Sequence, residues 1–342
     1  MRRRAAPVRA VATQGAAASQ AHVTEAARSI LRSGNAVDGV LAGVLAAAAE
    51  SPSVLFGPLQ LLVGGAGAGL LAIDGRVRQP GLGVPRPRGF VAEEAVPASA
   101  LVAVPGLPAA VVAAAAALGS MSLARAAGPA IELARACSPE RASLIERLVR
   151  RGAQGLAEGA VADELMAAAG RPARGLLTRE DLSSVLPAVV QCHEREGSSA
   201  GVVTVPWRDA QGDSSWTQVV AACDGKGLAA VACYEARLDG LPIPALGVVA
   251  PPLAAPVLRG AARVRPGEPR PASAPVALRL KAGSIDLVIG IAEASDAEES
   301  LEEMILVLVD MLAPAGAPLR ASQGRLVAIG RSRDAARVIA SA

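Results

Sequence analysis

The chain has 342 residues, and 52% of them are apolar, which predicts a globular protein with a sizeable core. Its aromatic residues are two Trp, one Tyr and two Phe, so the core must be built from Ala, Val and Leu. The net charge is +3, from 34 basic and 31 acidic residues mixed along the chain, and this balance argues against nucleic acid or an anionic membrane surface as a partner.

The cysteines and the N-terminus indicate the cellular compartment in which the protein is expected. Cys137, Cys192, Cys223 and Cys233 form no CxxC pair, and with only two histidines we expect no disulfide framework, no metal and no cofactor. His193 is interpreted as a surface loop residue. The basic start "MRRR" is expected to be a solvated arm, and no continuous apolar stretch of a secretory signal follows it. We therefore expect a cytoplasmic protein.

The first elements predict helices followed by a hairpin. Residues 24–34 have one apolar face, and residues 36–50 are apolar on every side, which is typical of a helix buried between layers. Residues 54–73 are uncharged and long enough to span a bilayer. Pro58 and five glycines argue against a span, and "GGAGAG" is predicted to be the turn of a buried hairpin.

The middle of the chain is predicted to be mainly helical. "ALVAVPG", residues 100–106, is predicted to be a strand. In "GLLTREDLSSV", Thr178 is expected to cap a helix with Asp181 three residues later. The other predicted helices cover 107–118, 122–137, 139–151 and about 160–169.

A polar stretch at 192–201 divides the chain, and the remainder is richer in strands. A helix is predicted at 297–313, whose apolar later portion fits either the core or a contact between two copies of the chain. The chain is predicted to finish with a strand at 324–330 and a helix at 332–340. The predicted strands of this part cover about 202–206, 216–223, 228–235, 275–281 and 285–291.

Several phrases, taken in order, resemble the γ-glutamyltransferases, which belong to the N-terminal-nucleophile hydrolases. The phrases are "AARSILRSGNAVDGVLAG", "AIDGRVRQP", "ALVAVPGLPAAV", "GLLTREDL", "DGKG", "RPGEPRPAS" and "GRLVAIGRSRDAARV". The resemblance implies a layered α/β fold, a four-layer αββα sandwich of reduced size. It also implies one domain over 1–342, with a large-subunit-like segment at 1–200 and a small-subunit-like segment at 201–342.

The resemblance also implies self-cleavage before a threonine that then attacks γ-glutamyl amides such as glutathione. Counting back from Asp224 places Ser215 at that position, while a one-residue insertion selects Ser214 and a two-residue slip selects Thr217. The plainer interpretation is a serine that turns the chain into a strand. Arg76 matches the family's carboxylate-binding arginine, and its plainer interpretation is a solvated loop residue.

Other landmarks of the family are altered. The run that holds the substrate amine becomes "APPLAAP" at 250–256, which offers no side-chain acceptor. The Pro-Leu-Ser-Ser segment retains Ser273 as its only hydroxyl. The glycine-rich oxyanion loop becomes "GIAEA" at 290–294, where the carboxylate of Glu293 opposes a developing negative charge.

Two functions follow from these observations. We favour a catalytically degenerate protein that keeps the scaffold for a binding or structural role, because function depends on the site and not on the fold. The alternative is an active γ-glutamyl hydrolase or transferase with Ser215 as nucleophile, Arg76 as carboxylate clamp and Ser273 as a positioning donor. A γ-glutamyl small molecule is the ligand that the resemblance implies in either case.

Overall fold

The fold is taken from a computed structural model of the chain. It describes residues 14–65, 67–85, 89–194, 201–207, 214–297, 299–301, 303–305, 324–332 and 335–340.

Two packed helices follow the first strand, close to their predicted positions. α1 (Ala21–Leu31) packs against α2 (Ala36–Glu50), nearly all of whose residues are buried. The side chain of Asn35 accepts a hydrogen bond from the backbone N–H of Asp38, and the Asp38 carboxylate accepts one from the N–H of Asn35. This reciprocal cap satisfies donors that the first turn of α2 leaves unpaired.

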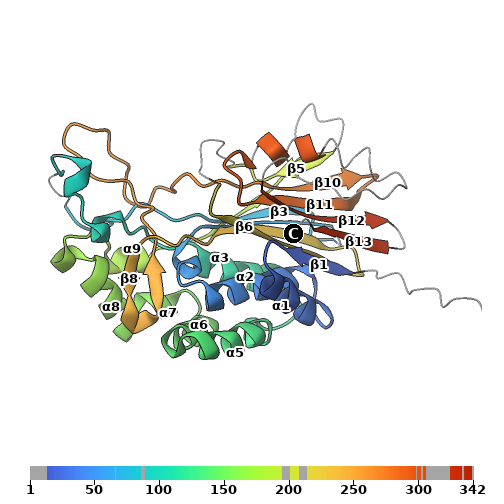
Figure 1. The fold of residues 1–342 in the computed structure, drawn as a ribbon, viewed down its shortest axis with the longest axis horizontal. Coiled ribbons are helices and arrows are strands. Elements are labelled where there is room, and N and C mark those ends of the chain that lie inside the picture. The colour runs from blue at the N-terminus through green and yellow to red at the C-terminus, as the bar shows by residue number, and fades with distance from the viewer. Residues whose placement is uncertain are drawn as a thin grey trace, which may run out of the picture.

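α2 lies on a six-stranded antiparallel sheet (Figure 1). Its strand order is β1-β6-β7-β2-β3-β4, so segments from both halves of the chain pair within it. The predicted hairpin at 54–73 is confirmed, because its two strands pair directly. The strands are β1 (Gly15–Ala18), β2 (Leu59–Gly64), β3 (Leu70–Gly75), β4 (Ala188–Gln191), β6 (Thr217–Cys223) and β7 (Ala229–Glu235).

A second antiparallel sheet covers the other face of the first, with strand order β13-β12-β11-β10-β5. Val219 and Val231 of the first sheet and Leu278 and Val288 of the second belong to one buried cluster between the sheets. The strands of the second sheet are β5 (Val202–Thr204), β10 (Val276–Lys281), β11 (Ser284–Ala292), β12 (Arg325–Ser332) and β13 (Ala335–Ala340).

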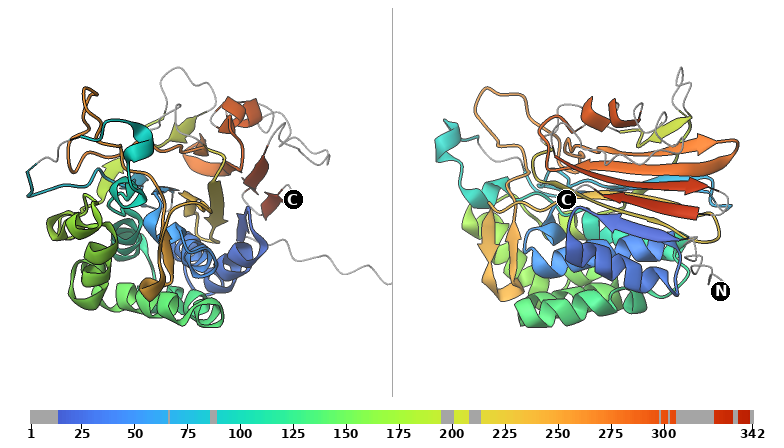
Figure 2. Two further views of the ribbon diagram at one scale, coloured as in Figure 1. Left: turned by 60° about the vertical axis from the view of Figure 1, so that its left-hand side comes forward. Right: turned by 45° about the vertical axis from the view of Figure 1, so that its right-hand side comes forward.

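A short helical segment covers the outer face of the second sheet. Residues 297, 299–301 and 303–305 are helical, and Leu301 and Ile305 pack against Leu287 and Ile289 of β11. This part of the predicted 297–313 helix therefore lies in a core, while 306–313 fall outside the described residues. The layers are helix, sheet, sheet and helix, as the two views in Figure 2 also show.

The remaining helices pack beneath the first sheet and at one end of it (Figures 1 and 2). The predicted cap by Thr178 is present at the start of α9, where the Thr178 hydroxyl oxygen accepts a hydrogen bond from the backbone N–H of Asp181. A separate two-stranded ribbon joins β8 (Leu241–Ile243) to β9 (Val248–Ala250). The helices are α3 (Leu107–Leu118), α4 (Leu123–Ala126), α5 (Gly128–Cys137), α6 (Pro139–Arg151), α7 (Gln154–Ala157), α8 (Gly159–Ala169) and α9 (Arg179–Ser183).

Two predicted elements are wrong. The predicted terminal helix at 332–340 contains β13, which pairs with β12, so strand pairing overrides the helix propensity of its alanines. The predicted strand at 100–106 makes only isolated bridges through Val102 and Val104, after a 3₁₀ turn at Ala98–Leu101. No helix among the described residues is long and apolar enough to cross a bilayer.

Replacement of Asp38 tests the cap of α2. The buried Asp38 carboxylate also accepts hydrogen bonds from the backbone N–H and the hydroxyl of Ser120. Asp38→Ala removes a charged acceptor that is shared by the N–H of Asn35 and by the N–H and hydroxyl of Ser120, so we expect a loss of about 2–3 kcal/mol in the free energy of unfolding, measured by urea titration. Glu132→Ala, at an exposed position of α5, is the matched control and should change it by less than about 0.5 kcal/mol. Equal stability of the two variants would contradict this role of Asp38.

The thiols should differ in reactivity. Cys137 is exposed, whereas Cys192, Cys223 and Cys233 are buried. Burial raises the pKa of Cys192 to about 11 and that of Cys223 to about 12, so both remain neutral, unreactive thiols at pH 8. A colorimetric disulfide reagent should titrate one thiol in the folded protein and four after denaturation. Rapid modification of two or more thiols in the folded protein would contradict this burial.

Candidate functional site

Polar side chains gather at one end of the sandwich, between the two sheets. Side chains alternate along a strand, and those of Val219, Cys233 and Leu62 point into the cluster between the sheets. By the same alternation, Thr217, Glu235, Gln60 and Asp74 belong to this inner face. These four side chains come from the adjacent strands β6, β7, β2 and β3, in that order.

The turn from Ser214 to Thr217 leads into β6. The backbone N–H of Thr217 donates to the carbonyl of Ser214 at 2.9 Å. Ser214 is 1% exposed, and its hydroxyl donates to the hydroxyl oxygen of Ser273 at 2.8 Å. Ser215 is exposed on the turn. Of the three predicted nucleophile positions, Ser214 therefore makes a direct buried contact with the predicted Ser273.

Thr217, the first residue of β6, has a different environment. Its side chain is 1% exposed, and its hydroxyl oxygen has no hydrogen-bond partner among the described residues. In the strand register Thr217 lies opposite Glu235, which is also buried. A buried hydroxyl without a partner is unusual and is one of the features that occur at functional sites.

Two side chains, those of Gln60 and Trp207, connect Ser273 to Arg76. The side-chain amide of Gln60 donates to the carbonyl of Ser273 at 2.7 Å, and its oxygen accepts from the indole N–H of Trp207 at 2.7 Å. The guanidinium of Arg76 lies over the Trp207 ring, 5.5 Å from the ring centroid. The structure thus brings Arg76, Ser273 and Ser214 to the same end of the sandwich.

The guanidinium of Arg76 is already paired. Its Nε donates to one oxygen of Asp74 at 3.0 Å, and its terminal nitrogen donates to the other at 2.9 Å. The pair is largely buried, with 16% of the Arg76 side chain and 5% of the Asp74 side chain exposed. The interpretation of Arg76 as a solvated loop residue is therefore wrong, and binding of a substrate carboxylate would compete with Asp74.

The 290–294 segment, predicted to be a loop, consists of the end of β11 and the two residues after it, and it comes to the start of β6. The backbone N–H of Glu293 donates to the carbonyl of Thr217 at 2.9 Å. Glu293 has a φ of 57°, a conformation that favours glycine. Its carboxylate accepts from the side-chain amide of Gln218 at 2.8 Å and pairs with Arg325 at 3.0 Å. A negative charge is therefore held by two partners beside the first residues of β6.

An apolar cluster lies behind Arg76. Val77, Ala103, Leu253 and Ala254 pack together, and the last two belong to the 250–256 segment. Val77 is 2% exposed, and neither it nor this part of the segment has a side chain that could accept a hydrogen bond. Among the described residues there is also no group of three or more His, Cys, Asp or Glu side chains suited to a metal ion.

Tyr234 lies at the same end of β7 but on the helix-facing side of the sheet. Burial raises the pKa of its hydroxyl well above the ordinary value, so the phenol stays neutral. Sequence analysis did not select Gln60, Trp207 or Asp74. The one signal for Gln60 was a polar residue within the apolar strand "LQLLVG", and Trp207 was one of two tryptophans.

No protein-family model matches the sequence, and no curated protein matches it. Cephalosporin acylase from Bacillus halodurans is similar in structure, with a TM-score of 0.72 and 14% identity over 96% of this chain and 96% of that chain. LmbA2991HD has a TM-score of 0.71 and 12% identity over 98% of this chain and 97% of its own. γ-Glutamyltranspeptidase from Pseudomonas nitroreducens has a TM-score of 0.45 and 19% identity over 54% of this chain and 69% of its own.

The two similarities that span nearly the whole chain define its class of fold. The chain has the layered α/β fold of the N-terminal-nucleophile hydrolases, a four-layer αββα sandwich. The fold class expected from the sequence is therefore confirmed.

The turn before β6 generates a stability prediction. Ser214→Ala removes the buried hydrogen bond to Ser273, so we expect a loss of about 1 kcal/mol in the free energy of unfolding. Ser215→Ala, one residue along and exposed, should change it by less than about 0.5 kcal/mol. Urea unfolding of both variants checks this order, and a larger loss for Ser215→Ala would show that Ser215 is the buried member of the turn.

Proposed function

We propose that the chain is a γ-glutamyltransferase-like protein that has lost catalysis and keeps the scaffold of the fold for a binding or structural role. The fold itself supports kinship with acylases of the N-terminal-nucleophile class, since one full-length match is a cephalosporin acylase. A fold alone does not determine an activity, so the loss of catalysis is argued from the residues of the site.

The environment of Glu293 carries this proposal. Acyl transfer creates an oxyanion that needs N–H donors aimed at it, and removal of one such donor costs on the order of 100- to 1000-fold in rate. The N–H of Glu293 instead donates to the carbonyl of Thr217, and the Glu293 carboxylate is held close to β6 by Gln218 and Arg325. Both features oppose an oxyanion at the start of this strand.

The surroundings of Arg76 support the same proposal. A γ-glutamyl group presents a carboxylate and an ammonium, which require a free guanidinium and side-chain acceptors. Arg76 is paired with Asp74, and the cluster of Val77, Leu253 and Ala254 offers no acceptor for the ammonium. Both the binding of a γ-glutamyl group and the catalysis of acyl transfer are therefore expected to be weak.

One observation favours an active enzyme as a second candidate. The Thr217 hydroxyl is buried without a partner at the first position of β6, and a nucleophile needs a free hydroxyl beside a base. In this alternative, self-cleavage before Thr217, Ser215 or Ser214 exposes an amine that serves as the base. Arg76 then acts as a carboxylate clamp after release from Asp74, and Ser273 positions the reacting group.

The mass of the purified chain separates the two candidates. We expect one intact chain of 342 residues and no release of anilide from a γ-glutamyl anilide above the background of buffer. The reason is the missing oxyanion donor, which should disable self-cleavage and hydrolysis alike. Mass spectrometry after prolonged incubation and a colorimetric anilide assay measure these outcomes.

Three variants identify the nucleophile if the purified chain proves to be cleaved. If two fragments form, Ser214→Ala, Ser215→Ala and Thr217→Ala identify the nucleophile, because only its own replacement should stop the cleavage. The mass of the C-terminal fragment gives the new N-terminus independently. Cleavage before one of these residues together with anilide release would overturn the proposed loss of catalysis.

A further inference from the structure

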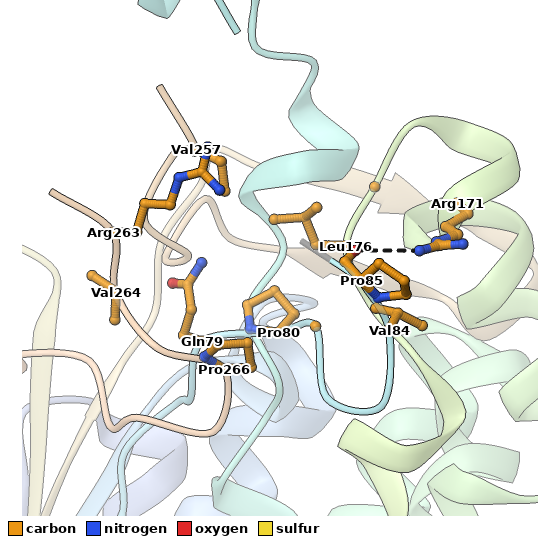
Figure 3. Close-up of a pocket in the computed structure, with 12 residues that line it drawn as sticks. Gln79, Pro80, Val84, Pro85, Arg171, Leu176, Val257, Arg263, Val264 and Pro266 are labelled. Atoms are coloured by element: carbon orange, nitrogen blue, oxygen red, sulfur yellow. Dashed lines mark hydrogen bonds between the residues drawn. The ribbon is translucent and has the colours of Figure 1, made fainter. Parts of the chain in front are cut away.

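A pocket lies among the loops beyond Arg76, separate from the turn before β6. Strand-like segments connect the two regions, since Arg78 bridges to Pro269 and the N–H of Arg270 donates to the carbonyl of Val77. The pocket has a volume of about 70 Å³. Figure 3 shows its lining, in which Leu176, Val257 and Pro266 are apolar and Arg171 and Arg263 are charged.

The floor of the pocket is fixed by backbone contacts. The side-chain amide of Gln79 donates to the carbonyl of Ala255 at 3.0 Å and accepts from its N–H at 2.8 Å. The backbone of Gln79 is bonded to Glu268 and Gly267. Because both ends of its amide are bonded to the backbone of Ala255, Gln79 holds together two segments that line the pocket.

The charges that line the pocket are positive. Arg263 is exposed and makes no hydrogen bond or ion pair with any described residue, and Arg171 makes one long contact of 3.3 Å to the carbonyl of Pro85. Figure 3 shows the two guanidinium groups on opposite sides of apolar side chains. None of the described residues that line the pocket is acidic, and the nearby Asp181 uses its carboxylate on the N–H groups of Gly81 and Leu82.

We propose that this pocket binds a small apolar carboxylate. The apolar body lies against Leu176, Val257 and Pro266, and the carboxylate pairs with Arg263, whose guanidinium has more free donors than that of Arg171. The proposal supplies a ligand class for the binding role proposed above and in that sense rests on it. The pocket itself uses no residue of the turn that precedes β6.

Matched ligands test both halves of the proposal by calorimetry on the full chain. Hexanoate should bind saturably with a dissociation constant in the millimolar range, and added salt should weaken it. Hexanol lacks the charge, hexylamine reverses it and acetate lacks the apolar body, so each should bind at least about fivefold more weakly. Absence of saturable hexanoate binding, or equal binding of hexanol, would overturn the proposal.

Variants assign the binding to this pocket. Arg263→Gln should weaken hexanoate binding about fivefold, Arg171→Gln less, and the control Arg150→Gln, at an exposed position on α6, not at all. Val264→Asp should abolish it by placing a like charge in the lining. Unaltered binding in both Arg263→Gln and Val264→Asp would place the ligand elsewhere and overturn the proposal.

This result is distinguishable from a failure of the proposed function. A chain that cleaves itself and also binds hexanoate at the pocket would overturn the loss of catalysis and leave the ligand class standing. An intact chain without anilide release that does not bind hexanoate would overturn the ligand class alone.

Discussion

The close approach of α2 to the first sheet is the constraint on which the remaining structure depends. A Cβ atom at Gly43 would lie 2.9 Å from a methyl group of Val220 in β6, and one at Gly39 would lie 3.6 Å from the Cβ atom of Ala222 in the same strand. Small side chains bury little area each, so the core gains its stability from dense packing of many of them. This packing fixes β6, and β6 in turn places Thr217 at the edge of the space between the sheets.

The same framework is compatible with the proposed loss of catalysis. The packing between the layers depends on Ala, Val, Leu and Gly and does not depend on which residues occupy the ends of the strands. At those ends, Glu293 occupies a backbone conformation that suits glycine, and Gln218 and Arg325 compensate by pairing with its carboxylate. The ion pair and hydrogen bond of Glu293 are thus local and leave the sandwich intact. Loss of catalysis is then compatible with retention of the whole fold, as the proposed function requires.

Sequence patterns predicted the fold where local signals and packing agree. The cap at Asn35, the all-apolar α2 and the glycine turn after β2 are examples. The sequence patterns gave the wrong element at residues 335–340, where an alanine-rich segment with helix propensity forms the edge strand β13. Pairing with β12 outweighs the intrinsic preference of these residues for a helix. In the candidate site, the spacing before Asp224 selected the turn that leads into β6, and a catalytic role for that turn stays a prediction. Contacts such as Trp207 with Gln60 join residues 147 positions apart, and no local pattern records them.

The central claim concerns the backbone N–H of Glu293, which the structure assigns to the carbonyl of Thr217. Amide hydrogen exchange at this one residue, followed by NMR on the purified full chain, tests it most directly. The account predicts exchange slowed by roughly a hundredfold or more relative to an unstructured peptide, as for a hydrogen-bonded core amide. Exchange at the unstructured rate would mean that this N–H is free to receive an oxyanion and would contradict the account.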